Sequence, residues 1–141
     1  MARSQTNLMT SVAYGLAILA VLGDTPATFA ADPPKPLSAK EARSKVDQEI
    51  VVEFLVKAAK DRLEKRGEIY LDSETEFRDE NNFSCVINRD GALSLRNASI
   101  ENPADHFRDK LIRVRGRVTL KDNIPRIEVS DAKQIEIVIP Q

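Results

Sequence analysis

The chain has 141 residues, of which 42% are hydrophobic and 30% are charged, and its formal net charge at pH 7 is −1. This length accommodates one folded domain and a short additional segment. The near-neutral charge implies no bulk electrostatic steering of a charged partner. The single cysteine, Cys85, excludes an internal disulfide bond, and its place in an apolar stretch predicts a buried, unreactive thiol.

Residues 1–30 have the pattern of a secretory signal peptide. Arg3 precedes a nearly unbroken apolar run from Val12 to Leu22, and Thr28-Phe29-Ala30 places small residues at positions −3 and −1 of a cleavage site. The apolar run has 11 residues, whereas a membrane-spanning helix needs about 20. We therefore expect an exported protein, periplasmic or extracellular, with no membrane attachment after cleavage.

The mature chain is expected to begin with a linker and a short helix. Residues 31–37 are rich in proline, which fixes the backbone in an extended conformation and predicts a linker. Ser38 and Glu41 then stand at the N-cap and N3 positions of a capping box, which predicts a helix that ends near Lys45. We place the folded domain at residues 38–141.

Apolar residues recur at every second position after this helix, which predicts β-strands. The segment between Asp90 and Arg108 lacks this alternation. Asn102-Pro103 within it has the pattern of an N-cap followed by a first-turn proline, so we expect a helical connection with Phe107 facing inward. The expected strands are Glu49–Ala58, Glu68–Asp72, Phe83–Asn88, Leu111–Lys121, Arg126–Ser130 and Ile135–Ile139, with turns at Arg66-Gly67 and Lys121-Asp122-Asn123.

Five main strands with a helix after the third form the layout of the OB-fold, a small and partly open Greek-key barrel. The segments that carry this pattern are Ser38–Ala42, Asp47–Phe54, Gly67–Leu71, Asn82–Ile87, Lys110–Val118, Pro125–Val129 and Gln134–Ile135. They are similar to single OB-fold modules of bacterial exported or nuclease-associated proteins. The resemblance implies an all-β fold, a five-stranded Greek-key OB-fold barrel with a short N-terminal helix and a helical connection between strands 3 and 4. The chain departs from those modules at Asp47-Gln48-Glu49, where they commonly carry a glycine turn.

The predicted strand Leu111–Lys121 has a basic face, while Gly116 on its inward face is expected to allow sharp coiling of the barrel. Its outward positions carry Arg113, Arg115, Arg117 and Lys121. The first strand of an OB-fold pairs with the fourth, so Glu49 and Glu53 can lie opposite this row and form cross-strand ion pairs. We favour that interpretation over a phosphate-binding stripe. The candidate ligand face of the second interpretation consists of Arg113, Arg115, Arg117, Lys121, Arg126 and Tyr70.

The usual OB-fold binding surface lies on the second and third strands and their flanking loops. Between these strands the segment Asp72–Glu80 is strongly acidic, and we expect it to repel a phosphate backbone. The basic residues of the first turn are Lys60, Arg62, Lys65 and Arg66. Because Asp61, Glu64 and Glu68 interleave with them, we interpret this segment as a solvated, charged turn. Nucleic acid is thus a possible but disfavoured partner.

The sequence offers no recognisable catalytic set. The single histidine, His106, falls on the predicted short helix and has no second histidine or cysteine placed to form a metal site or a nucleophile pair. We therefore expect no enzymatic activity, no cofactor and no metal ion. The favoured hypothesis is an exported, non-catalytic OB-fold module that binds an unidentified protein or small ligand. The alternative is an OB-fold protein that binds single-stranded nucleic acid.

Overall fold

The computed structural model describes residues 35–140. The expected signal peptide, residues 1–30, and most of the expected linker lie outside the described residues. No helix in the described part of the chain is long and apolar enough to cross a membrane. At the start of this part, Leu37 forms an isolated parallel bridge with Val52, so the end of the proline-rich segment lies along the first strand.

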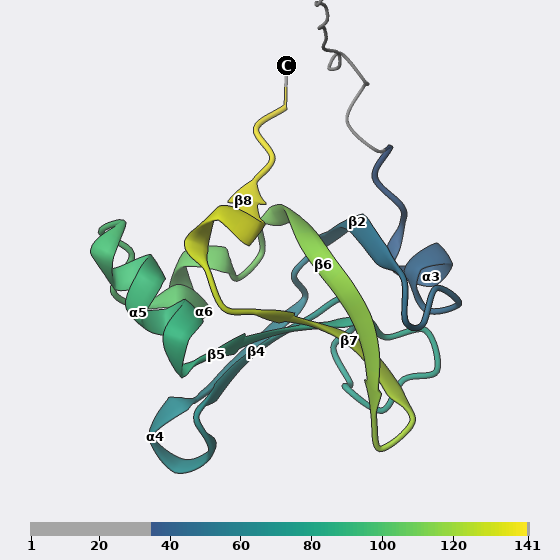
Figure 1. The fold of residues 1–141 in the computed structure, drawn as a ribbon, viewed down its shortest axis with the longest axis horizontal. Helices are drawn as coiled ribbons and strands as arrows, with labels where there is room; N and C mark the ends of the chain where they lie inside the picture. Colours follow the sequence, from purple (N-terminus) through teal and green to yellow (C-terminus); the bar gives the residue numbers. More distant parts are fainter. Residues whose placement is uncertain (1–34, 141) are drawn as a thin grey trace, which may run out of the picture. The chain divides into compact units, whose positions relative to one another are not determined.

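The core of the fold is a mixed, seven-stranded β-sheet (Figure 1). Its strands follow the order β2-β6-β7-β5-β4-β3, and β8 pairs with β6 off this path. Every pair is antiparallel except β5 with β7, which is parallel. The strands are β2 (Glu49–Leu55), β3 (Ala58–Arg62), β4 (Glu68–Asp72), β5 (Ser84–Asn88), β6 (Leu111–Lys121), β7 (Ile124–Val129) and β8 (Ile135–Ile137).

The β-rich architecture confirms the expected all-β fold class, whereas the sheet has seven strands and not the five that we expected. The predicted strand Glu49–Ala58 ends earlier, at Leu55, and a further strand, β3, begins at Ala58 and includes Lys60 and Arg62, which we expected in a turn. The two strands are distinct, because β2 pairs with β6 whereas β3 pairs with β4. Val56 and Lys57 lie between them, and the change of partner bends the chain there. The sheet path ends at β2 and β3, and the described residues contain no pairing between these two strands, so the sheet is not closed.

Helices α3, α5 and α6 occupy the predicted places, whereas α4 and η3 were not predicted, and α5 and α6 lie together in Figure 1. Ser38 and Glu41 form the predicted capping box, although the helix ends at Ala42. The Asn102 side chain accepts a hydrogen bond from the backbone N–H of Asp105, and Phe107 is buried as predicted. The helical segments are α3 (Ala39–Ala42), α4 (Leu63–Arg66), α5 (Arg89–Asn97), α6 (Pro103–Phe107) and the 3₁₀ turn η3 (Ala132–Gln134).

Left-handed backbone residues mark the sharp turns. Asp47, just before β2, has a φ of 67°, which aspartate tolerates better than most residues. Asp122 and Asn123 have φ of 53° and 64° between β6 and β7, which fits a type I′ hairpin turn at the predicted position. This hairpin extends beyond the core, so Leu120, which the alternation of β6 places on the same face as Gly116, is half exposed.

Gly116 on β6 is required by close packing and not by an unusual backbone angle. A Cβ atom at this position would lie 2.6 Å from Cγ2 of Ile127 on β7, and Ile127 is fully buried. The neighbouring inward residues Ile112, Val114 and Val118 are also fully buried, as the alternation of β6 predicts. The glycine therefore creates the space in which the Ile127 side chain lies.

Gly116→Ala is expected to lower the free energy of unfolding by about 1–3 kcal/mol, because the added methyl group overpacks the core against Ile127. Urea denaturation followed by circular dichroism measures this change. Thr119→Ser, at an exposed position of the same strand, is the control and is expected to change stability by less than about 0.5 kcal/mol. Equal stability of the two variants would contradict the packing role of Gly116.

Candidate functional site

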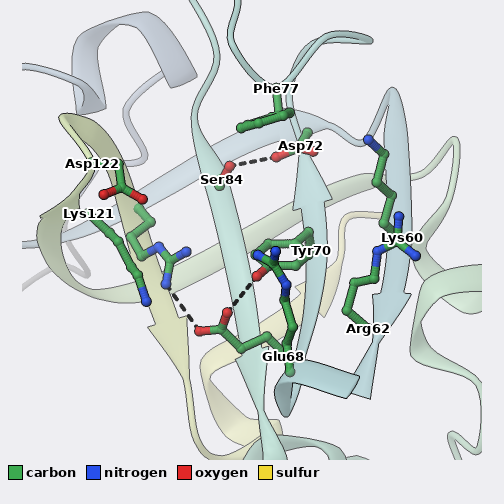
Figure 2. Close-up of a pocket in the computed structure, with 11 residues that line it drawn as sticks. Lys60, Arg62, Glu68, Tyr70, Asp72, Phe77, Ser84, Lys121 and Asp122 are labelled. Atoms are coloured by element: carbon green, nitrogen blue, oxygen red, sulfur yellow. Dashed lines mark hydrogen bonds and ion pairs between the residues drawn. The ribbon is translucent and has the colours of Figure 1, made fainter. Parts of the chain in front are cut away.

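A cavity of about 560 Å³ lies on the outer face of β3, β4, β5 and β7 (Figure 2). Its volume is within the range of sites for small ligands. We call it the sheet-face cavity. It is lined by Lys60, Arg62, Arg66, Glu68, Tyr70, Asp72, Phe77, Ser84, Lys121, Asp122 and Arg126.

Strand alternation and strand register together bring the lining residues to one face. Ile69 and Leu71 of β4 are fully buried, so the residues between and beside them point outward. Tyr70 lies opposite Lys60 of β3 in the antiparallel register. Asp72 lies opposite Ser84 of β5. The turn between β3 and β4 and the hairpin between β6 and β7 then border the cavity from two sides.

The cavity has an excess of positive charge. Its five basic residues face three carboxyl groups, those of Glu68, Asp72 and Asp122. One basic residue, Arg126, forms an ion pair with Glu68 at 3.2 Å. The other four are exposed, and no carboxylate among the described residues lies within 4.0 Å of their charged groups: Lys60, Arg62, Arg66 and Lys121. Four cations are thus available to an anionic ligand.

Glu68 links an aromatic and a basic side chain within the cavity. The Tyr70 hydroxyl donates to Oε1 of Glu68 at 2.5 Å, and Arg126 donates to Oε2 at 3.2 Å. Burial raises the pKa of Glu68, but the Tyr70 hydrogen bond and the Arg126 charge outweigh it, so the pKa lies below its ordinary value. Burial, followed by the hydrogen bond to Glu68, raises the pKa of Tyr70. The arrangement holds the tyrosine ring in a fixed position.

Asp72 and Ser84 belong to a buried polar network at the edge of the cavity. Ser84 Oγ donates to Asp72 Oδ1 at 2.5 Å, and Asn82 Nδ2 donates to the same oxygen at 3.3 Å. Asn82 is fully buried, and its Oδ1 accepts from the backbone N–H of Glu74 and from the Ser73 hydroxyl. The network fixes the two ends of the loop between β4 and β5.

Two aromatic rings reach the cavity. Phe77 is 40% exposed, and its ring lies 5.6 Å from Nζ of Lys60 and 5.0 Å from the guanidinium carbon of Arg78. Tyr70 is half-buried, and the Arg126 guanidinium lies 6.0 Å from its ring centroid. Both rings therefore combine an apolar surface with adjacent positive charge, as cation–π contacts do.

The sequence-predicted ligand face divides into two groups. Tyr70, Lys121 and Arg126 line the cavity. Arg113, Arg115 and Arg117 do not, because they lie on the outer face of β6 where it pairs with β2. The structure therefore brings together only half of the predicted set.

Of the three arginines on the outer face of β6, one forms the expected cross-strand ion pair with β2. Arg113 lies opposite Glu53 and donates to its Oε1 through Nη2 at 2.8 Å and Nε at 3.2 Å. Arg117 lies opposite Glu49, but no carboxylate among the described residues is within 4.0 Å of Arg117 or of Arg115. Both unpaired arginines are exposed.

The acidic segment Asp72–Glu80, which we expect to repel a phosphate backbone, lies mostly outside the cavity. Asp72 is buried in its polar network, and Glu74 pairs with Lys57 at 3.2 Å. Of the whole segment, only Asp72 and Phe77 line the cavity. The remaining acidic residues of the loop are exposed and absent from the lining.

Sequence reasoning missed three basic residues of the cavity. Lys60, Arg62 and Arg66 were interpreted as part of a solvated turn, because acidic residues alternate with them. Lys60 and Arg62 lie on β3, however, and the intervening Asp61 is absent from the lining, as period-two alternation requires. The same two-residue periodicity, applied to residues 58–62, would have placed Lys60 and Arg62 on one face of a strand.

Two other residues considered in the sequence, Cys85 and His106, do not line the sheet-face cavity. Cys85 is fully buried, and burial, followed by the charge of Asp72, raises the pKa of its thiol. His106 is exposed on α6. Within residues 35–140, no group of three or more His, Cys, Asp or Glu side chains is arranged to hold a metal ion.

The chain shares its fold with known OB-fold domains. A putative aspartyl-tRNA synthetase from Leishmania major matches with a TM-score of 0.50 and 11% identity over 83% of this chain. Asparaginyl-tRNA synthetase from Pyrococcus horikoshii matches with a TM-score of 0.50 and 12% identity over 74% of this chain. The match covers 23% of each synthetase, so this chain spans less than a quarter of their length.

A third similar structure is OBody AM1L10, solved in complex with hen egg-white lysozyme. It matches with a TM-score of 0.50 and 17% identity over 77% of this chain and 98% of its own. No known protein family and no curated protein matches the sequence. The structural matches support an OB-fold and, at these low identities, establish the fold alone.

Arg113→Ala is expected to lower the free energy of unfolding by about 0.2–1 kcal/mol through loss of the cross-strand pair with Glu53. Arg115→Ala is the matched control, because it removes the same side chain two residues along β6 without breaking an ion pair among the described residues. Chemical denaturation at low salt measures both. A larger loss for Arg115→Ala would contradict the assignment.

Glu68→Gln is expected to destabilise the protein most above about pH 4.5. Because the pKa of Glu68 is lower in the folded protein than its ordinary value of 4.5, its carboxylate stabilises the fold above that value. This contribution is lost as the pH falls through the lowered pKa. Thermal unfolding from pH 7 downward should therefore show the variant and the wild type converging. Glu101→Gln, which alters an exposed side chain outside the cavity, should show no such convergence.

Proposed function

We propose that this protein binds single-stranded nucleic acid through the sheet-face cavity. The observation that carries the proposal is the combination of four exposed cations, without carboxylate partners among the described residues, and two aromatic rings in one cavity. Cations neutralise backbone phosphates, and aromatic rings stack on bases irrespective of sequence. Composition alone argues against such a ligand, but the local charge of the cavity supports it.

The position of the cavity supports the same proposal. OB-folds bind oligonucleotides and oligosaccharides on their second and third strands and on the loops between strands 1 and 2 and strands 4 and 5. We infer that β2 and β3 are the two halves of the first barrel strand, so that β4, β5, β6 and β7 are strands 2 to 5 of a five-stranded Greek-key barrel. The cavity then lies over strands 2 and 3 and between both of those loops.

Two further parts of the proposal rest on the sequence. The pattern of residues 1–30 supports an exported protein that meets its ligand in the periplasm or outside the cell. The lack of a recognisable catalytic set supports binding without catalysis. Sequencing of the N-terminus of the secreted protein tests the first part, since a chain that retains residues 1–30 would contradict it.

A protein partner is the second candidate for the same face. The OBody structure, which is a complex with lysozyme, favours this alternative because the match covers nearly all of that chain. The two candidates differ in their response to salt. The logarithm of nucleic-acid affinity falls steeply and linearly with the logarithm of the salt concentration. A protein interface with an apolar centre does not require such a fall.

A variant that combines Lys60→Ala with Arg62→Ala is expected to weaken binding of single-stranded DNA. Each lost phosphate contact should reduce the slope of log affinity against log salt by about 0.7. Fluorescence anisotropy with a labelled oligonucleotide of about 12 nucleotides measures affinity and slope.

The control variant combines Arg115→Ala with Arg117→Ala, which removes the same amount of charge from the outer face of β6. This control should retain the wild-type slope. If the wild type binds no single-stranded oligonucleotide at low salt, the proposed function is wrong. If the β6 variant alone loses binding, the phosphate-binding stripe on β6 replaces the cavity as the site.

A further inference from the structure

Asp72 differs from the other two carboxyl groups of the sheet-face cavity. Both carboxylate oxygens of Glu68 have partners, Tyr70 and Arg126, and Asp122 lies exposed on the β6–β7 hairpin. Asp72 is only 2% exposed, yet it lines the cavity and forms no ion pair with any described residue. Burial of an acidic group without a cationic partner costs free energy.

One oxygen of Asp72 lacks a hydrogen-bond donor in the described part of the protein. Oδ1 accepts from Ser84 Oγ at 2.5 Å and from Asn82 Nδ2 at 3.3 Å, whereas no described residue donates to Oδ2. The network also holds the carboxyl group in place, because Asn82 and Ser84 are themselves buried. The cavity therefore contains a fixed hydrogen-bond acceptor with unused capacity.

This acceptor lies close to the exposed aromatic ring. Asn82 Nδ2, which donates to Asp72, also donates to the backbone carbonyl of Phe77 at 3.0 Å. Figure 2 shows the Phe77 ring beside the Asp72 and Ser84 side chains, with Lys60 on β3 flanking the space. A flat ring that stacks on Phe77 can then direct one edge to Asp72 while its phosphate approaches the cations of β3.

The chemistry of nucleobase edges determines which base fits this acceptor. Cytosine, adenine and guanine carry an exocyclic amino group that donates hydrogen bonds. Uracil and thymine carry carbonyl oxygens on both sides of their single N–H group, and the lone pairs of these oxygens repel a carboxylate. A carboxylate paired with a cytosine amino group is an established mode of base recognition.

We propose that Asp72 and Phe77 form a base-recognition site that selects a nucleobase with an exocyclic amino group and disfavours uracil and thymine. Phe77 stacks on the base, and Oδ2 of Asp72 accepts a hydrogen bond from the amino group. This inference rests on the proposed nucleic-acid function and specifies the ligand class of the same cavity.

The test compares oligodeoxycytidine with oligodeoxyuridine of equal length, about 12 nucleotides, by fluorescence anisotropy at low salt. The two pyrimidines differ only in the hydrogen-bonding edge, so differences in stacking are small. We expect the wild type to bind oligodeoxycytidine about five- to tenfold more tightly, as one added hydrogen bond allows. Equal affinity would overturn the base-recognition site and leave the proposed function intact. No binding of either probe would overturn both.

Asp72→Asn tests the role of the acceptor, because asparagine has the same shape and offers a donor as well as an acceptor. The ratio of the two affinities should fall to about one while salt-dependent binding persists. The variant that combines Lys60→Ala with Arg62→Ala is the matched control and should weaken both probes equally, with the ratio unchanged. An unchanged preference in Asp72→Asn would overturn the assignment. Thermal unfolding of the Asp72→Asn variant establishes that it folds. The comparison of the two probes with the wild-type protein tests the base-recognition site without relying on the variant.

Discussion

The chain passes from β2 to β3 through Val56 and Lys57, and the backbone of these two residues is held from two sides. The N–H of Val56 donates to the carbonyl of Lys110, just before β6, and the N–H of Lys57 donates to the carbonyl of Asp72 at the end of β4, both at 2.9 Å. One continuous segment is thereby shared between two strand partners, which forces the sheet to curve round on itself. The curvature encloses the buried aliphatic residues on one side and leaves a polar face on β3, β4, β5 and β7. Because the second of these bonds ends on Asp72, the bend of the chain and the edge of the cavity are fixed by the same contact.

The charge of the whole chain does not describe the charge that a ligand meets. The formal net charge is −1, yet the cavity presents five basic residues against three carboxyl groups, of which one is neutralised by Arg126 and one is buried. The separation arises from strand geometry, since residues adjacent in sequence point to opposite faces. Lys60 and Arg62 therefore face the cavity although Asp61 stands between them. Local charge at this face governs the encounter with an anionic ligand over distances shorter than about 10 Å at ordinary salt.

Much of the fold was predictable from the sequence, because alternation of apolar residues is a property of the strands themselves. The capping box at Ser38, the N-cap at Asn102 and the hairpin turn at Asp122 were each encoded by a few neighbouring residues. The division of the first strand was not predictable in this way, because it depends on which distant strand each half meets. The site was predicted in part: Tyr70, Lys121 and Arg126 were identified, whereas Phe77 lies in a loop without periodicity. Asp72 was interpreted as one member of an acidic loop, and only the tertiary contacts with Ser84 and Asn82 distinguish it.

The buried amide of Asn82 also has a consequence for the choice of expression host. Asn82-Phe83-Ser84 has the sequence of an N-glycosylation acceptor, and a eukaryotic secretory pathway can modify such a site before folding is complete. The acceptor atom would be Nδ2, which in the folded protein donates to Asp72, Ser84 and the Phe77 carbonyl inside a fully buried environment. A sugar chain cannot be accommodated there, so glycosylated molecules would be unable to close the loop between β4 and β5. Production in a host that does not attach glycans to asparagine avoids this competition between modification and folding.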